Sequence, residues 1–261
     1  MHYDAATGKE RKLNRIKLSD QIAEDLRVRI ARDGLQPGDR LPHERALMEY
    51  YGCSKGTMRE ALKALEVEGL VRMLSGPNGG PEIQSTSSDT VTQQLRQYLH
   101  FQKVDFTQVY ELRRPLEVIL VRDVIGRLTQ AQIARLEENI RVCEEANAAQ
   151  DRDLVRRVET EFHDILCDAS DNVMLVFMCR FLNSMLRDLV NYRTASMREH
   201  ENFGDANIQS HKQLLAALKA GDANAAAGIM HDHMCCAESY MRRLDASFHS
   251  DLLSRVRPGS A

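Results

Sequence analysis

The chain has 261 residues, of which 43% are hydrophobic and 28% charged, and its formal net charge is −3. This composition is typical of one or two globular domains and excludes an intrinsically disordered chain. The chain lacks the run of about 20 apolar residues that a membrane helix needs, and no apolar segment follows the basic N-terminus as it would in a secretory signal.

The N-terminal part of the chain predicts an arm followed by an amphipathic helix. Residues 1–17 are mostly polar, and we expect them to be a partly disordered arm. Apolar side chains recur every four residues in 18–32, which predicts a helix with Ser19 or Asp20 as its N-cap. Gly34 is expected to end this helix.

The next fifty residues predict two more helices and a β-hairpin. Pro42 suits the first position of a helix that ends at Gly52, and Ser54 can cap a third helix that ends at Gly69. Two short β-type runs then flank a turn rich in Gly and Asn, which predicts a hairpin. Three helices and a hairpin over residues 18–85 follow the order of a winged helix-turn-helix.

The second part of the chain predicts an antiparallel, all-helical bundle. Residues 86–90 are small and polar and suit a linker, residues 91–250 show only helical periodicity, and 251–261 form a tail. The helices are expected near 90–102, 105–127, 130–149, 152–169, 173–195, 202–219 and 222–247. Their most distinct N-caps are Asp105, Thr129 and Asp222. The fold class is therefore mainly α.

The third helix carries the candidate DNA-contacting residues. In a helix-turn-helix, the second helix of the pair enters the major groove with its N-terminal residues facing base edges. Ser54, Lys55, Gly56, Thr57 and Arg59 occupy that end. Lys55 and Arg59 share one helix face, and both can donate hydrogen bonds to guanine or to phosphate oxygens. A basic pair of this kind also occurs on surfaces that bind nothing.

The segment LQPGDRLPHERALMEYYGCSKGTMREALKALEVEGLVRM resembles the DNA-binding domain of the GntR family, which has G-x-x-L-P-x-E-R, R-E-A-L and E-G-L motifs. The matching residues are Pro37, Gly38, Leu41, Pro42, Glu44, Arg45, Ser54, Arg59, Glu60, Ala61, Leu62, Leu65, Glu68, Gly69 and Leu70. The resemblance implies DNA contacts by Arg45, Ser54, Lys55, Thr57 and Arg59, and minor-groove contacts by the wing tip at Gly76, Asn78 and Gly79. Lys55 replaces the family's usual Arg and lacks its bidentate fork, so it can read either a base or a phosphate.

Residues 90–250 resemble the FCD effector domain, the helical ligand-binding half of the FadR subfamily of GntR regulators. Three stretches carry this resemblance: YELRRPLE, VETEFHDIL with Glu159 in place of the family's Asp, and SHKQLLAAL followed by AAAGIMHDHM. The last two segments match helices that each carry a histidine in the family.

Glu159, His163, His211 and His233 are the candidate metal ligands. Glu159 and His163 are four residues apart and share a helix face, while His211 and His233 each lie on an apolar stripe of a later helix. Buried imidazoles and a carboxylate need partners, and one divalent cation satisfies all four. Each histidine alone is more often a hydrogen-bonded core residue. The donor set favours zinc, with nickel or manganese as alternatives, over calcium or magnesium.

Arg113 lies at a position that often meets an anionic effector in the family. Because Arg can hold a carboxylate through two parallel hydrogen bonds, the resemblance implies a small organic acid as the effector. An acyl-CoA is the alternative, but the branch of the subfamily that binds acyl chains tends to lack the metal histidines.

Together these patterns predict a ligand-responsive regulator, by expectation a repressor, that binds a palindromic operator in double-stranded DNA as a homodimer. The six cysteines include no CxxC pair and are expected to be buried free thiols of a cytoplasmic protein without a membrane partner. Two alternatives stay open: a purely structural metal in the same regulator, and a metal-dependent enzyme. Against the enzyme, no further residue stands in a motif for a general base.

Overall fold

The computed structural model describes residues 16–76, 79–102, 104–192, 197–243 and 246–248. It divides into two compact units that meet between Thr90 and Val91, and each unit has its own hydrophobic core. All but the last two residues of the expected arm, and the whole expected tail, lie outside the described residues. In the part of the chain that the structure describes, no helix combines the length and apolarity needed to cross a membrane.

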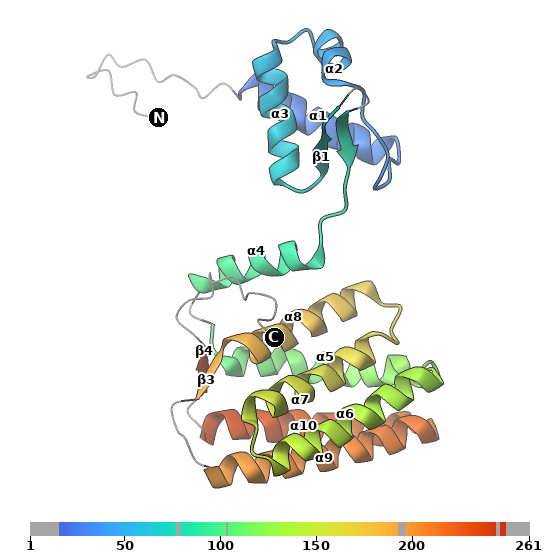
Figure 1. Cartoon of the computed structure of the whole chain (residues 1–261), viewed down its shortest axis with the longest axis vertical. Coiled ribbons are helices and arrows are strands. Elements are labelled where there is room, and N and C mark those ends of the chain that lie inside the picture. Colours follow the sequence, from blue (N-terminus) through green and yellow to red (C-terminus); the bar gives the residue numbers. More distant parts are fainter. Residues whose placement is uncertain (1–15, 77–78, 103, 193–196, 244–245, 249–261) are drawn as a thin grey trace, which may run out of the picture. The chain divides into compact units, whose positions relative to one another are not determined.

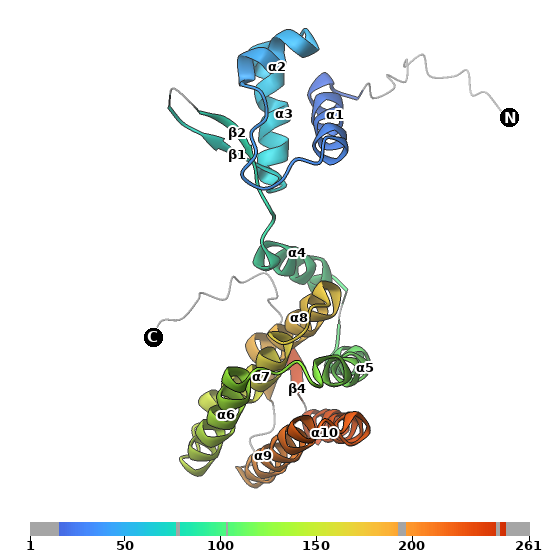
Figure 2. The ribbon, with the colours of Figure 1, turned by 90° about the vertical axis from the view of Figure 1, so that its right-hand side faces the viewer.

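The first unit consists of three helices and an antiparallel hairpin, in the predicted order. Its elements are α1 (Leu18–Arg32), α2 (Glu44–Tyr51), α3 (Lys55–Val67), β1 (Val71–Leu74) and β2 (Gly80–Ile83). Figure 2 shows α1 and the hairpin on opposite sides of α3. Leu26 of α1 packs with Met58, Leu62 and Leu65 of α3, and all four side chains are buried. The amphipathic spacing that predicted these helices therefore builds the core.

The N-cap of α1 differs from the prediction. The helix begins at Leu18, and Lys17 occupies the cap position without a side-chain hydrogen bond. Ser19 and Asp20 consequently lie inside the first turn, where the negative charge of Asp20 interacts favourably with the helix dipole. The C-terminal prediction was correct, since Gly34 follows the helix in a left-handed conformation with φ +65°.

The two helices of the helix-turn-helix, α2 and α3, begin largely as predicted, with one difference at the start of α2. α2 begins at Glu44 instead of Pro42 because the preceding backbone pairs with the hairpin, where the Leu41 N–H donates to the carbonyl of Pro81 over 3.0 Å. Ser54 caps α3 by accepting a hydrogen bond from a backbone N–H inside the first turn.

The second unit is a bundle of long helices, as predicted. These are α4 (Ser88–His100), α5 (Phe106–Val124), α6 (Gln130–Ala148), α7 (Arg152–Cys167), α8 (Val173–Leu189), α9 (Met197–Ala220) and α10 (Ala223–Arg243). Figure 1 shows α6, α7, α9 and α10 with their axes nearly aligned, and α10 packs against both α5 and α9. Asp105 and Thr129 form capping boxes, and Asp222 accepts two backbone N–H bonds at the start of α10.

A short antiparallel ladder in this unit was not predicted. β3 (Val190–Tyr192) follows α8 directly and pairs with β4 (Ala246–Phe248). The expected helices at 173–195 and 222–247 therefore end early. The pairing joins segments far apart in the sequence, which a search for local periodicity cannot detect.

The cysteines match the prediction in part. All six are free thiols, and Cys143, Cys167 and Cys179 are buried. Cys53 and Cys235 are half-buried, whereas Cys236 is exposed on α10.

Candidate functional site

Three histidine side chains converge in the core of the second unit. His163 of α7, His211 of α9 and His233 of α10 are all buried. The Nε2 atom of His233 lies 3.3 Å from Nε2 of His211 and 3.3 Å from Nε2 of His163. Phe162 stacks on the His211 ring at 3.9 Å between centroids and holds its plane. The three nitrogens thus face a common point between the helices.

This geometry fits a bound metal ion better than hydrogen bonding among the rings. Two nitrogens at about 2.1 Å from one zinc ion lie about 3.4 Å apart at a tetrahedral angle. A separation of 3.3 Å is long for a hydrogen bond between two nitrogens, which would also need one ring to donate. The ligand atoms of all three residues lie within 4.8 Å of one another. The residues present therefore suit a divalent transition-metal ion.

Glu117 on α5 orients the first of these histidines and was not among the predicted site residues. Its Oε2 lies 3.0 Å from Nδ1 of His163, and the carboxylate is completely buried. A proton on Nδ1 that donates to Glu117 leaves the Nε2 lone pair directed at the metal position. Burial alone would raise the pKa of Glu117, but His163 and Arg113 together lower it below its ordinary value. Glu117 therefore stays ionised and fixes the ring.

Burial governs the protonation of the other two histidines. The pKa values of His211 and His233 are lowered well below the ordinary 6.5, first by loss of hydration and then by neighbouring positive groups, including Arg113. Neutral imidazoles are the form that can coordinate a metal.

Glu159 lies beside the three histidines but outside their tight group. Its Oε1 is buried without a hydrogen-bond partner, while Asn207 of α9 hydrogen-bonds with the carboxylate. Burial raises the pKa of Glu159 to about 7, an effect that Asn207 and Arg113 reduce. Glu159 shares the lining of one cavity with His163 and His233, which keeps it a candidate fourth ligand.

Arg113 lies in the same part of the core. A cavity of about 50 Å³, the inner cavity, is lined by Arg113, Arg156, Glu159, His163, Asn207 and His233, among others. The Arg113 side chain is only 7% exposed, and its Nε lies 3.5 Å from Oε1 of Glu117. The structure thus brings the predicted effector residue and three of the four predicted metal ligands, Glu159, His163 and His233, to the wall of one cavity, while His211 completes the histidine group beside it.

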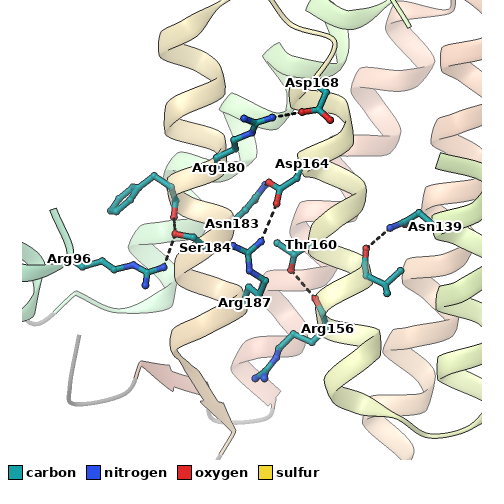
Figure 3. Close-up of polar contacts among 12 residues, drawn as sticks. Arg96, Asn139, Arg156, Thr160, Asp164, Asp168, Arg180, Asn183, Ser184 and Arg187 are labelled. Carbon is teal, nitrogen blue, oxygen red and sulfur yellow. Dashed lines mark hydrogen bonds and ion pairs between the residues drawn. The ribbon is translucent and has the colours of Figure 1, made fainter. Parts of the chain in front are cut away.

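A series of polar contacts leads from α7 to α4 (Figure 3). Asp164, next to His163, accepts hydrogen bonds from Asn183 (3.2 Å) and Arg187 (3.1 Å) of α8. The neighbouring Ser184 accepts a hydrogen bond of 2.8 Å from Arg96, the buried residue of α4. Because α4 begins at Ser88, it is the element through which the chain passes from the first unit to the second.

The predicted DNA-contacting residues lie on the exposed side of α2 and α3. Arg45 and Arg59 are solvent-exposed, with their Nε atoms 3.1 Å from Glu49 and Glu44 respectively. Lys55 is the first residue of α3 and is exposed. The other two predicted contacts, Ser54 and Thr57, are linked by a hydrogen bond of 2.9 Å between their hydroxyl groups.

The wing is tied to the helix-turn-helix by His43, which sequence analysis did not single out. Its Nδ1 lies 3.0 Å from the carbonyl oxygen of Gly79. A Cβ on Gly79 would lie 2.3 Å from the carbonyl oxygen of Leu74, so only glycine fits there. Gly76 is exposed and has a φ of +102°, whereas Asn78 lies outside the described residues.

Two family models match the chain, one for each unit. Residues 18–77 match the model described as "Bacterial regulatory proteins, gntR family", and residues 108–235 match the model described as "FCD domain".

Curated relatives and a solved structure agree with these matches. The HTH-type transcriptional repressor NanR of Edwardsiella tarda is 28% identical, covering 93% of this chain and 92% of that protein. The HTH-type transcriptional regulator LutR of Bacillus subtilis is 27% identical, covering 79% and 93%. The structure of Streptococcus agalactiae GntR is similar in fold, with a TM-score of 0.57 and 23% identity over 85% of this chain and 99% of that one.

Proposed function

The chain belongs to the GntR family of bacterial regulatory proteins and carries an FCD domain, and we propose that a small organic acid bound at the histidine site controls its binding to DNA. The protein is a DNA-binding transcriptional regulator and not an enzyme. One observation carries the proposal: His163, His233 and Arg113 line the inner cavity together, and His211 lies within the same tight group of imidazoles. An octahedral ion bound by the three histidines and Glu159 would keep two coordination positions for a ligand carboxylate, and Arg113 would supply a second contact for it.

In this proposal His163, His211 and His233 hold the metal, with zinc favoured over nickel and manganese, and Glu159 moves in as a fourth ligand. The metal supplies a Lewis-acidic position for the acid. The chain's own residues exclude bulk water, orient His163 through Glu117 and keep Arg113 charged beside the cavity. NanR is named a repressor, which supports the proposal that this chain represses transcription until the acid releases it from DNA.

The DNA-binding proposal assigns the exposed ends of α2 and α3 to the major groove. Arg45, Ser54, Lys55, Thr57 and Arg59 make these contacts, and the wing at Gly76, Asn78 and Gly79 enters the minor groove. The exposure of Arg45, Ser54, Lys55 and Arg59 supports this assignment, and Thr57 is half-buried beside Ser54.

We also propose that the regulator binds a palindromic operator as a homodimer in the cytoplasm. Leu112 and Ile119, two turns apart on α5, are each at least half exposed, as expected of large apolar side chains that a second copy covers. Sedimentation equilibrium should give twice the mass of one chain. A mass of one chain at micromolar concentration would contradict the dimer.

A thermal-shift screen against small carboxylic acids, with and without prior chelation, tests the sensor proposal. An acid at a hundred times its dissociation constant should stabilise the metal-loaded protein by about 2.7 kcal/mol, which raises the melting temperature by several degrees. The shift should vanish after chelation. If chelation instead unfolds the second unit and no acid stabilises the loaded protein, the metal is purely structural.

A further inference from the structure

A second, larger cavity adjoins the inner one. This outer cavity has a volume of about 210 Å³ and is lined by Arg152, Asp153, Arg156, Glu159, His200 and Phe203, among others. Arg156, Glu159 and Phe203 line both cavities. A ligand that spanned the two cavities would run along the first turns of α7, which carry Arg152 and Arg156.

The volumes of the two cavities indicate which part of such a ligand each cavity would hold. A single water molecule needs about 10–15 Å³ of cavity volume, so the 50 Å³ of the inner cavity accommodates a carboxylate and little more. The remainder of any larger acid must lie in the outer cavity, which is about four times as large.

The charges of the outer cavity favour a second anion. Arg152 and Arg156 are four residues apart, which places them on one face of α7. Asp153 is the acidic neighbour, with its Oδ1 3.3 Å from Arg156, but its side chain is 87% exposed and therefore strongly hydrated. Two guanidinium groups thus line this cavity together with two carboxyl groups, of which Asp153 is solvated and Glu159 belongs to the proposed metal site. The planar fork of Arg matches a carboxylate group.

The opposite wall is aromatic. Phe203 of α9 stacks on Tyr240 of α10, with 3.8 Å between ring centroids and an angle of 5° between the ring planes. His200 hydrogen-bonds with the hydroxyl group of Tyr240. This wall offers an apolar surface for a short carbon chain between the two polar ends.

We propose that the outer cavity is a second anion subsite, in which Arg152 and Arg156 bind the distal carboxylate of a dicarboxylic acid. This inference rests on the proposed function, since the proximal carboxylate is the one held by the metal and Arg113. It assigns the choice between monocarboxylic and dicarboxylic effectors to two residues of α7 that are not among the proposed metal ligands.

Two pairs of 2-hydroxy acids test the subsite, because the members of each pair differ only in the second carboxylate. The probes are 2-hydroxybutyrate against malate, and 2-hydroxypentanoate against 2-hydroxyglutarate. Isothermal titration of the full-length, metal-loaded protein should show at least tenfold tighter binding of the dicarboxylate in one pair or both. In the double variant Arg152→Gln, Arg156→Gln, this preference should disappear. In Arg152→Gln alone it should weaken while monocarboxylate affinity changes less than threefold, because Arg152 lines only the outer cavity.

Two controls separate charge from structure. The exposed neighbour Arg157 is changed to Gln, which should leave the preference intact. The variant Arg152→Lys, Arg156→Lys retains both positive charges and should keep part of the preference for the dicarboxylate. Equal binding of both members of each pair by the wild type, or a preference that survives the double Gln variant, overturns the subsite alone. If none of the four acids binds to the metal-loaded protein, the proposed acid sensor fails and the subsite fails with it.

Discussion

The buried carboxylate of Glu117 determines which ring nitrogen of His163 faces the proposed metal position. Without a partner on Nδ1, His163 could place its proton on either ring nitrogen, and a proton on Nε2 would block metal binding. Glu117 removes that choice through its 3.0 Å contact, and it is itself held by Arg113. One pair of contacts therefore links the metal ligand to the residue proposed to bind the effector.

Replacing Glu117 by Gln should weaken metal binding by about 10- to 100-fold, because the oriented, electron-rich imidazole is lost. Competition with a chromophoric chelator measures this affinity. Glu161→Gln, an exposed position on the same helix as His163, is the matched control. Affinities within twofold of the wild type for Glu117→Gln would show that the contact has no influence on the metal.

The buried histidines predict acid sensitivity of the metal-free protein. In the unfolded chain, His211 and His233 take up protons near pH 6.5, whereas burial lowers their pKa values in the folded state. Stability conferred by their neutral forms is complete above pH 6.5 and is lost as the pH falls toward the folded pKa values. The free energy of unfolding should decrease by up to about 1.4 kcal/mol per pH unit for each imidazole.

Urea denaturation of the chelated protein between pH 7.5 and 5 measures this dependence. The variant His211→Gln should show a shallower decrease than the wild type. The exposed His231 offers a control, since His231→Asn should leave the slope unchanged. A flat profile in the wild type would be inconsistent with buried neutral imidazoles.

On α3, the helix proposed to enter the major groove, Arg59 and Lys55 should contribute differently to DNA binding. The contact with Glu44 orients the Arg59 fork, so Arg59→Ala should relax the preference at one base position and cost about 1–3 kcal/mol on the best sequence. Lys55→Ala should weaken binding to all sequences alike and reduce the salt dependence by about one counterion. Lys63→Ala, nearer the end of α3, is the control. Uniform weakening by Arg59→Ala would refute its role as a base reader.

At the scale of elements, the sequence predicted what is determined locally. The capping residues Ser54, Asp105 and Thr129 start their helices as expected, because each side chain satisfies backbone N–H groups within its own first turn. The start of α2 and the β3–β4 ladder could not be predicted, since both depend on pairing with segments far along the chain.

The same distinction applies to the site. The spacing of the histidines on three helices was visible in the sequence, because each lies on an apolar stripe. Glu117 is the last residue of the YELRRPLE motif, and nothing in the local sequence pattern indicates that α5 brings it to His163. Likewise, the distance of Glu159 from the tight histidine group depends on side-chain packing and not on its helical spacing.

The polar contacts from α7 through α8 to α4 supply a route by which the site can act on the linker helix. Replacing Arg96 by Met should remove the hydrogen bond to Ser184, leave acid affinity within about twofold, and reduce the factor by which the acid changes operator affinity. Such coupling factors usually lie between 5 and 150. Combined calorimetry and operator titration separate the two quantities.

Arg180→Met is the matched control for this prediction. Arg180 also joins α8 to the C-terminal end of α7, through Asp168, and among the described residues this is the ion pair that it makes. Its removal should leave the coupling factor unchanged. If Arg96→Met retains the full response to the acid, the signal takes another route.

At the scale of the whole molecule, the chain combines a DNA-binding unit and an FCD effector unit, and each unit has its own hydrophobic core. The acid can influence DNA binding only by its different affinities for the DNA-competent and DNA-released forms. A tenfold change in operator affinity corresponds to about 1.4 kcal/mol of coupling between the two sites.

The most direct test of this account is the affinity for an operator, measured by fluorescence anisotropy with and without the acid. The duplex is selected from a random library with the metal-loaded protein, and the acid is the strongest stabiliser in the thermal-shift screen. We expect the acid to weaken operator binding at least tenfold when the metal is present and to have no effect after chelation. An affinity that the acid leaves unchanged, or changes equally in the chelated protein, would contradict metal-dependent control.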